Sequence, residues 1–382
     1  RHQRLWLFSI GKAAPAMAEG AANTLQRSLL AFAGGLIVSP EPGSPPSATV
    51  TAMVGDHPVP GRNSFAAAAR LADLVAGMKS HDMALVLISG GASSLIGAPM
   101  RGMAEGDFSH LYEMLLNSGL DIREINAVRK RFSRWGGGRL ALALAPATIH
   151  CLAISDVVGD DISSIGSGPC VADPYTVKDV IEILQRAKLY QRLAPSFREL
   201  LAGTQRGVIP ETPKATHPAF AHVSTQVIVN NRVALDAAAA HAASLGIAQV
   251  TVADATLQGN AADVGEALAR ALIERRAQAE GRRSVLLCGG ETTVAIPHPT
   301  LTPALRGRGD AAMPPAPIPR GGRCQELALA AARALSEAGD AARGITLLAA
   351  GTDGRDGPTD AAGGCVDGST WDAIRDAGRD PA

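Results

Sequence analysis

Glycine stands beside hydroxyl and charged side chains at four points of the sequence where a short apolar segment ends. The four segments are Ser9-Ile10-Gly11-Lys12, Ser89-Gly90-Gly91-Ala92-Ser93-Ser94, Cys288-Gly289-Gly290-Glu291-Thr292-Thr293 and Ala350-Gly351-Thr352-Asp353-Gly354. Glycine lets backbone N–H groups point at an anion, and the dipole of a following helix favours negative charge at the same place. One such turn is ordinary in an α/β protein, whereas four of them favour phosphate or nucleotide binding.

Lys12 directly follows a glycine, at the start of an Ala-rich helical pattern. It could be a solvated lysine of a first helical turn, or a cation for a transferring phosphoryl group or a substrate carboxylate. No GxxxxGK[ST] precedes it, so the segment is not a Walker A loop. No GxGxxG follows the first apolar segment, so a dinucleotide fingerprint is also absent.

Arg320 and Arg323 flank the pair Gly321-Gly322 just before another helical pattern. Two guanidinium groups at a helix start suit the clamping of an oxyanion, although a basic surface loop would look the same. Each glycine disfavours helix by about 1 kcal/mol relative to Ala. The helix is therefore predicted to begin after Gly322, with Arg323 held on its first turn.

Carboxylates gather in the Gly-rich segment near the end of the sequence. Asp353, Asp356 and Asp360 lie within eight residues, a set of hard oxygen ligands that would suit magnesium. A solvated turn would have the same composition. Asp156, which also follows an apolar segment, carries the same ambiguity, and His57 is expected to be a hydrogen-bonding loop residue rather than a general base.

These residues follow apolar segments that alternate with helical patterns. Strands are predicted at 5–10, 35–39, 84–89 and 148–154, and helices at 13–30, 64–78, 105–116 and 121–133, with Asn63 as the N-cap of the second helix. Near-continuous apolar strands between helices are typical of an α/β fold, with a mainly parallel sheet covered on both faces. Because the carboxyl ends of parallel strands share one edge, the Gly-rich turns are expected to gather there.

A break in composition at 203–224, with three prolines, predicts a domain boundary. We place one domain at 1–222 and a second at 223–382. In the second, strands are predicted at 226–229, 249–253, 284–288 and 345–349, and helices at 232–244, 261–280 and 325–337. The Pro-rich stretch 298–319 has no apolar period and is predicted to be an exposed insertion.

Composition excludes several classes of protein. The 36 Lys and Arg residues balance 36 Asp and Glu residues, so no basic excess favours nucleic acid as a partner. No apolar run reaches membrane-spanning length, so no membrane partner is expected. The five cysteines form no CxxC pair, which argues against a zinc site or a disulfide framework and favours a reduced, cytoplasmic location.

The order of the motifs along the chain resembles a known family. The matching segments are Ile10-Gly11-Lys12-Ala13-Ala14, Asp56-His57-Pro58-Val59-Pro60, Ser89-Gly90-Gly91-Ala92-Ser93, Ile125-Asn126-Ala127-Val128-Arg129-Lys130, Ser155-Asp156-Val157-Val158-Gly159-Asp160, Gly289-Gly290-Glu291-Thr292-Thr293, Arg320-Gly321-Gly322-Arg323 and 351–363. In these segments the chain is similar to ATP-dependent glycerate 2-kinases with a MOFRL carboxy-terminal domain. The match spans nearly the whole chain.

The resemblance implies two α/β domains, the first Rossmann-like, with a groove between them. It also implies transfer of the γ-phosphoryl group of ATP to D-glycerate, giving 2-phosphoglycerate and ADP with Mg²⁺ as cofactor, in a monomer or homodimer. Lys12 and either Arg323 or Arg320 fall on the family's proposed catalytic pair. Substrate or nucleotide binding is expected at Gly11, Ser89, Gly90, Gly91, Ser93, Asp156, Gly289, Gly290, Glu291, Thr292, Gly351 and Thr352, and metal binding at Asp353, Asp356 and Asp360.

Three departures from the family pattern leave alternatives open. Cys324 stands where the family usually has Asn, the Pro-rich insertion precedes the same motif, and both ends of the chain look cut, with the family's last Gly/Thr-rich segment expected beyond Ala382. A truncated, inactive anion-binding fragment is therefore one alternative. The other is an NAD(P)H-dependent hydroxypyruvate reductase, a label given to some family members, against which the absence of GxGxxG argues.

Overall fold

The computed structural model of the chain describes residues 3–254, 256–279, 281–294 and 321–380. These form two compact units, Arg1–Asn230 and Asn231–Ala382. The division follows the strand β6 (Val223–Val229), whereas the sequence analysis placed the boundary before it. The strand belongs to the first unit because it pairs with that unit's sheet along its whole length.

The first unit is built on one six-stranded sheet in the order β3-β2-β1-β4-β5-β6, and every neighbouring pair is parallel. The remaining strands are β1 (Arg4–Ile10), β2 (Phe32–Ser39), β3 (Val50–Val54), β4 (Asp82–Ile88) and β5 (Thr148–Ile154). The predicted parallel α/β sheet is thus confirmed. The short strand β3 at the sheet edge is the one strand of this sheet without a predicted counterpart.

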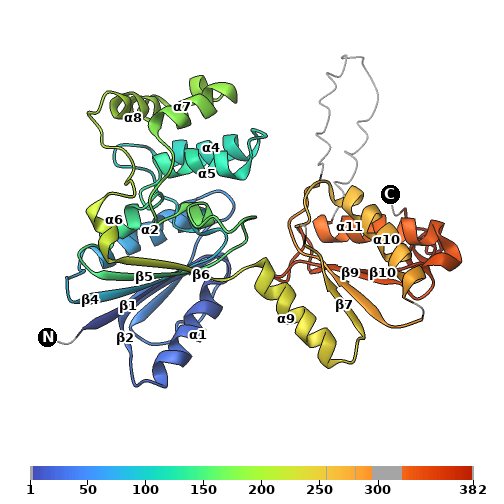
Figure 1. Ribbon diagram of the computed structural model, residues 1–382. Coiled ribbons are helices and arrows are strands. Elements are labelled where there is room, and N and C mark those ends of the chain that lie inside the picture. Colours follow the sequence, from blue (N-terminus) through green and yellow to red (C-terminus); the bar gives the residue numbers. More distant parts are fainter. Residues whose placement is uncertain (1–2, 255, 280, 295–320, 381–382) are drawn as a thin grey trace, which may run out of the picture. The chain divides into compact units, whose positions relative to one another are not determined.

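Alternate residues of the central strand enter two different cores, one on each face of the sheet. Leu7 packs with Ala14 and Ala18 of α1 (Ala14–Gln26), whereas Phe8 packs with Leu71 of α2 (Arg62–Val75) and Leu140 of α6 (Arg139–Leu144). Figure 1 shows α1 on one side of the sheet and α2 and α6 on the other. This alternation follows from the two-residue period of a strand whose two faces are both covered.

A helical layer stands beyond α2 and α6, on the side of the sheet away from α1 (Figure 1). It comprises α4 (Glu105–Leu116), α5 (Ile122–Phe132), α7 (Val177–Arg186) and α8 (Pro195–Gln205), which share a core of their own. The bounds of α4 agree with the sequence prediction. Sequence analysis missed α7 and α8, although Thr176 and Asp179 form a capping box at α7 and Pro195 opens α8, and both are recognisable start signals.

Helix α2 is capped differently from the prediction. Its N-cap is Gly61, and Asn63 lies inside the first turn. The carboxylate of Asp56 takes over the capping task, because it accepts hydrogen bonds from the backbone N–H of Asn63 (2.8 Å) and of Ser64 (3.1 Å). The loop that carries His57 is thereby tied to the start of α2.

The second unit contains two small sheets. Strands β7 (Gln249–Val252) and β8 (Ser284–Leu287) are parallel, whereas β9 (Thr346–Ala350) and β10 (Gly363–Asp367) are antiparallel. The helices are α9 (Asn231–Ser244), α10 (Ala261–Gln278), α11 (Arg323–Glu337) and α12 (Thr370–Asp376). The four Gly-rich turns therefore do not share one sheet edge, and the segment after β9 joins an antiparallel pair.

Small residues set the packing of the second unit. Ala261 and Ala269 of α10 and Ala328, Ala331 and Ala332 of α11 are buried in its core. A Cβ on Gly265 would lie 2.2 Å from the carbonyl oxygen of Leu327, so the two helices approach closely only because no side chain stands between them. Within the part of the chain that the structure describes, no helix is long and apolar enough to cross a membrane.

Candidate functional site

The turns that follow β1 and β4 are interlocked. Gly11 has φ of +135°, and a Cβ there would lie 2.1 Å from the hydroxyl oxygen of Ser89. The backbone N–H of Lys12 donates to the carbonyl of Gly90 (2.9 Å), and that of Ala13 donates to the hydroxyl of Ser89 (3.0 Å). Because only glycine fits at position 11, the two turns meet and fix the backbone of Lys12 at the carboxyl edge of the sheet.

The turn after β5 joins the same edge. A Cβ on Gly90 would lie 2.0 Å from Oδ2 of Asp156, so this carboxylate sits directly against the glycine turn. Gly91 has φ of +83° and precedes the short helix α3 (Ala92–Leu95), in which Ser93 is half-buried. Three neighbouring strands thus bring the predicted residues Gly11, Lys12, Ser89, Gly90, Gly91, Ser93 and Asp156 together.

His57 faces this edge from the loop between β3 and α2. A Cβ on Gly91 would lie 3.2 Å from Nε2 of the ring and 3.7 Å from Cγ of Lys12. Burial lowers the pKa of His57, and the positive charges of Lys12 and Arg129 lower it further. Of the residues that the structure describes, none hydrogen-bonds the imidazole, contrary to the expected loop role, so His57 presents a neutral ring to the turn at neutral pH.

Arg129 is the functional candidate that sequence reasoning missed. It lies on α5, is 7 % exposed, and places its guanidinium group 4.3 Å from the ring centre of Tyr112. The hydroxyl of Tyr112 donates to the carbonyl of Ser93 (3.1 Å), which connects this pair to the glycine turn. The available signal was the run Arg129-Lys130-Arg131, three consecutive cations between the apolar residues Val128 and Phe132.

In the second unit, the turn after β8 is closed by main-chain contacts. The backbone N–H of Glu291 donates to the carbonyl of Leu257 (3.0 Å), and a Cβ on Gly290 would lie 2.2 Å from that same oxygen. A Cβ on Gly289 would lie 2.0 Å from the side-chain oxygen of Asn231. Gly289 and Gly290 are therefore required for close approach within the protein.

Arg323 is the first residue of α11, and Gly322 is its N-cap, which confirms the predicted helix start. The guanidinium group forms an ion pair with Glu291 and donates to the carbonyl of Thr292 (3.3 Å). Burial acts to lower the pKa of Arg323, but the hydrogen bond and charge of Glu291 outweigh it and raise the pKa. The predicted residues Arg323, Gly289, Gly290, Glu291 and Thr292 thus form a second set, whereas Arg320 and the stretch 298–319 lie outside the described residues.

Asp356 serves a different purpose from the predicted metal ligand. Its carboxylate is 4 % exposed and accepts hydrogen bonds from the backbone N–H groups of Cys324 (3.0 Å) and Gln325 (2.7 Å). It thus supplies the cap that Gly322 cannot supply. The cap uses the main chain of Cys324, so it does not depend on the side chain at the position where the family usually has Asn.

Most other residues of this segment are solvent-exposed. Thr352, Asp353 and Asp360 are exposed, and the backbone N–H of Gly351 donates to the carbonyl of Ala362 (2.7 Å). Among the described residues, no three His, Cys, Asp or Glu side chains are placed to hold a metal ion together. The predicted trio of Asp353, Asp356 and Asp360 therefore does not form a ready-made site, because Asp356 is committed to α11.

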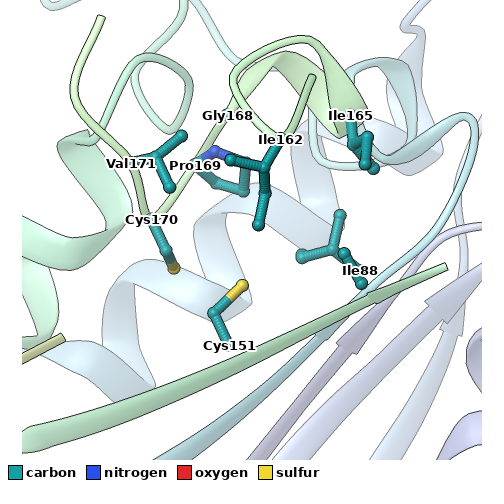
Figure 2. A pocket seen from close by; sticks show the side chains of 9 residues that line it. Ile88, Cys151, Ile162, Ile165, Gly168, Pro169, Cys170 and Val171 are labelled. Atoms are coloured by element: carbon teal, nitrogen blue, oxygen red, sulfur yellow. The ribbon is translucent and has the colours of Figure 1, made fainter. Parts of the chain in front are cut away.

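An apolar pocket of the first unit has no charged side chain in its lining. Ile88, Ile162 and Ile165 line it together with Cys151 and Cys170, as Figure 2 shows. The hydrogen bond to Cys151, together with burial, raises the pKa of Cys170 well above its ordinary value. The thiol of Cys170 therefore stays protonated, and all five cysteines are free.

Two families match the chain. The family described as a domain of unknown function, DUF4147, matches residues 1–202, and the MOFRL family matches residues 284–382. These matches cover parts of both units.

Several named proteins are similar over nearly the full chain. A D-glycerate 2-kinase of Thermotoga maritima is 34% identical over 381 residues, 99% of this chain and 82% of that protein. A protein of Agrobacterium vitis with a provisional hydroxypyruvate reductase name is 37% identical over 380 residues, 99% of this chain and 90% of its own length. A crystal structure of glycerate kinase from Thermotoga maritima has a TM-score of 0.77 at 32% identity, covering 100% of this chain and 83% of that one.

Proposed function

The chain belongs to the glycerate kinase family that carries a MOFRL domain, and from this premise we propose that it transfers the γ-phosphoryl group of ATP to D-glycerate. The products are 2-phosphoglycerate and ADP. The observation that carries the proposal is the juxtaposition of Lys12 with the glycine turn Ser89-Gly90-Gly91 at the carboxyl ends of β1 and β4. A cation carried by a fixed backbone beside such a turn suits an anionic substrate undergoing phosphoryl transfer.

Positioning and charge stabilisation account for most of the catalysis in phosphoryl transfer. We assign Lys12 and Arg323 as the catalytic cations, and the backbone of Lys12 is held by its hydrogen bond to Gly90. His57, a neutral imidazole beside Lys12, is suited to accept the proton of the substrate hydroxyl. Nucleotide and substrate binding are proposed for the turns that carry Gly11, Ser89, Gly289 and Gly351.

The donor set fits Mg²⁺ carried by the nucleotide. Mg²⁺ keeps several waters and commonly takes only one or two carboxylates beside phosphate oxygens, so a ready-made cluster of three is not needed. Asp353 and Asp360 are exposed carboxylates that would supply such ligands, and the carboxylate of Asp356 accepts two backbone hydrogen bonds from α11. When bound, the ion neutralises charge on the phosphates.

A coupled assay tests the proposal. D-glycerate with Mg-ATP should release ADP, and enolase added to the product should give phosphoenolpyruvate directly, because enolase accepts 2-phosphoglycerate and not the 3-isomer. Absence of ADP release with a folded protein would refute the kinase assignment. Formation of 3-phosphoglycerate would refute the regiochemistry alone.

The hydroxypyruvate reductase name of the Agrobacterium vitis relative supplies the second candidate. This candidate is tested by adding hydroxypyruvate with NADH or NADPH to the protein and measuring oxidation of the cofactor. The turn after β1 contains a single glycine followed by Lys12, so the dinucleotide fingerprint is lacking there, and no oxidation of the cofactor is expected.

We also propose a monomer or homodimer in the cytoplasm. The five free thiols fit a reducing compartment. Light scattering during size-exclusion chromatography tests the oligomeric state.

A further inference from the structure

Three consecutive cations are buried on α5. Arg129 is 7 % exposed, Lys130 is 0 % exposed and Arg131 is 1 % exposed. Removing a charge from water is unfavourable unless an opposite charge or a dense set of hydrogen bonds compensates it. The three residues therefore each require a partner, and they can be compared within one helix.

Lys130 and Arg131 have their partners inside the protein. Nζ of Lys130 lies 3.7 Å from Oδ1 of the buried Asp173 and 3.3 Å from the hydroxyl of Ser163. Arg131 donates to Oε2 of Glu211 at 2.6 Å. The charges of both residues are thus balanced without a ligand.

Arg129 differs from its two neighbours. Within the described part of the chain no carboxylate pairs with Arg129, whereas Arg131 is paired with Glu211, and the interaction of Arg129 is with the ring of Tyr112. Both arginines have a buried Nε–H without a hydrogen-bond partner, so the difference between them is the missing carboxylate. Burial lowers the pKa of Arg129, and the only opposing effect comes from Tyr112. An aromatic face compensates a guanidinium group only partly.

The position of Arg129 indicates where its missing partner would lie. Tyr112, beneath the guanidinium group, is hydrogen-bonded to Ser93 in the helix that follows the glycine turn. The charges of Arg129 and Lys12 both act on His57, whose ring lies against Gly91. Arg129 therefore belongs to the edge at which Lys12 and His57 meet, and an anion bound there would complete its pairing.

We propose that Arg129 binds the carboxylate of the hydroxy-acid substrate. This assignment rests on the proposed function, since it names how that substrate is held. A guanidinium group presents parallel N–H donors that match the two oxygens of a carboxylate, and stacking on Tyr112 holds its plane. Lys12 and the glycine turn remain for the phosphoryl group, so substrate recognition and phosphoryl transfer use different cations.

Ligand-induced stabilisation and kinetics together test the assignment. Thermal unfolding of the full chain is followed with D-glycerate, with glycerol, which lacks the carboxylate, and with ADP. The variants are Arg129→Met, Arg129→Lys and, as the matched control, Arg123→Gln, which removes an exposed cation from the same helix. Arg129→Met should weaken D-glycerate binding about 100-fold and Arg129→Lys about 10-fold, because a charge-assisted bidentate pair is lost or reduced.

The control variant should bind D-glycerate normally, and binding of ADP should not depend on Arg129. Arg123→Gln should bind D-glycerate as the wild type does, and ADP should stabilise all variants alike. The KM for D-glycerate should rise in Arg129→Met, while the KM for ATP stays within about threefold. Without ligand, Arg129→Met should unfold at the same or a higher temperature than the wild type, because an uncompensated buried charge has been removed.

Each contrary result has a defined meaning. Unchanged D-glycerate binding in Arg129→Met, or a selective loss of ADP binding, would overturn the carboxylate assignment. Failure of both Arg129 variants to fold would also overturn it, since the group would then stabilise the protein without a ligand. Arg129-dependent binding of D-glycerate without ADP release from the wild type would refute the kinase proposal and leave the carboxylate site standing.

Discussion

The two units hold their charged groups in different ways. In the first unit, Lys12, His57 and Arg129 converge on one edge of a six-stranded sheet, and the charge of Arg129 is not balanced by a described carboxylate. In the second unit, Arg323 is paired with Glu291, and Asp356 is bound to the start of α11. Arg129 is therefore ready for an anion, whereas Arg323 must exchange a partner before it can bind one.

The difference also follows from the frameworks. The parallel sheet of the first unit brings several strand ends to one edge, with a core on each face. The second unit has two-stranded sheets and a core of small residues between α10 and α11, so its chemistry depends on loops joined by side-chain bonds. We therefore expect substitutions in the first unit to affect turnover and those in the second to affect stability as well.

The largest effect is expected for Lys12→Ala. Removing a cation that stabilises the transferring phosphoryl group should lower kcat by about 100-fold or more, while the exposed side chain contributes little to folding. Steady-state kinetics and circular dichroism would measure the two effects. A folded variant with normal kcat would remove Lys12 from the catalytic set and weaken the contrast between the units.

Arg323→Lys should lower kcat by about 10- to 100-fold, because lysine keeps the charge and loses the planar fork. The same change at Arg320 should have a smaller effect. Glu291→Gln sharpens this prediction, since it frees Arg323 from its ion pair and should lower the KM for ATP. A larger loss in Arg320→Lys would reverse the assignment of the two arginines.

Asp356→Ala should destabilise the protein by about 1 to 2 kcal/mol, because the carboxylate caps α11 through two backbone N–H groups. Urea unfolding measures the loss. Asp353→Asn is the matched change at an exposed carboxylate of the same segment, and it should instead raise the Mg²⁺ concentration needed for half-maximal rate. A shifted Mg²⁺ requirement without destabilisation in the Asp356 variant would restore it as a metal ligand.

The smallest effect is the pH dependence that comes from His57. Burial and the charges of Lys12 and Arg129 lower the pKa of His57 below its ordinary value of 6.5. Below pH 6.5 the unfolded chain therefore binds a proton at His57 more readily than the folded chain does. Its contribution to stability is complete above pH 6.5 and is lost as the pH falls through the lowered pKa. Unfolding of wild type and His57→Asn between pH 7.5 and 5 should show the wild type losing more stability, and parallel curves would contradict this.

Local patterns in the sequence were enough to predict much of the framework. The apolar runs of β1 and β5 and the periodicity of α4 have local causes, as does the start of α11 after Gly321-Gly322. The position of the turn that carries Lys12 was also predictable, because this turn comes directly after the apolar run of β1.

The failures involve contacts between distant residues. Asp356 caps a helix that begins more than thirty residues earlier in the chain, a contact that no local pattern reveals. Arg129 depends on Tyr112 from another helix, and no spacing rule connects the two. The sequence around Gly363 and Gly364 is typical of a loop. These residues form the strand β10 because they pair with β9.

The interlocked turns after β1 and β4 have a consequence for amide hydrogen exchange. The N–H of Lys12 is bonded to Gly90 and that of Ala13 to Ser89, although the side chain of Lys12 is exposed. Exchange at these two amides requires the turns to separate, so both should exchange slowly even in the ligand-free protein. If a bound nucleotide slows exchange at these two amides only slightly, the turns already have their bound geometry in the free protein. Binding would then cost little conformational entropy at this edge.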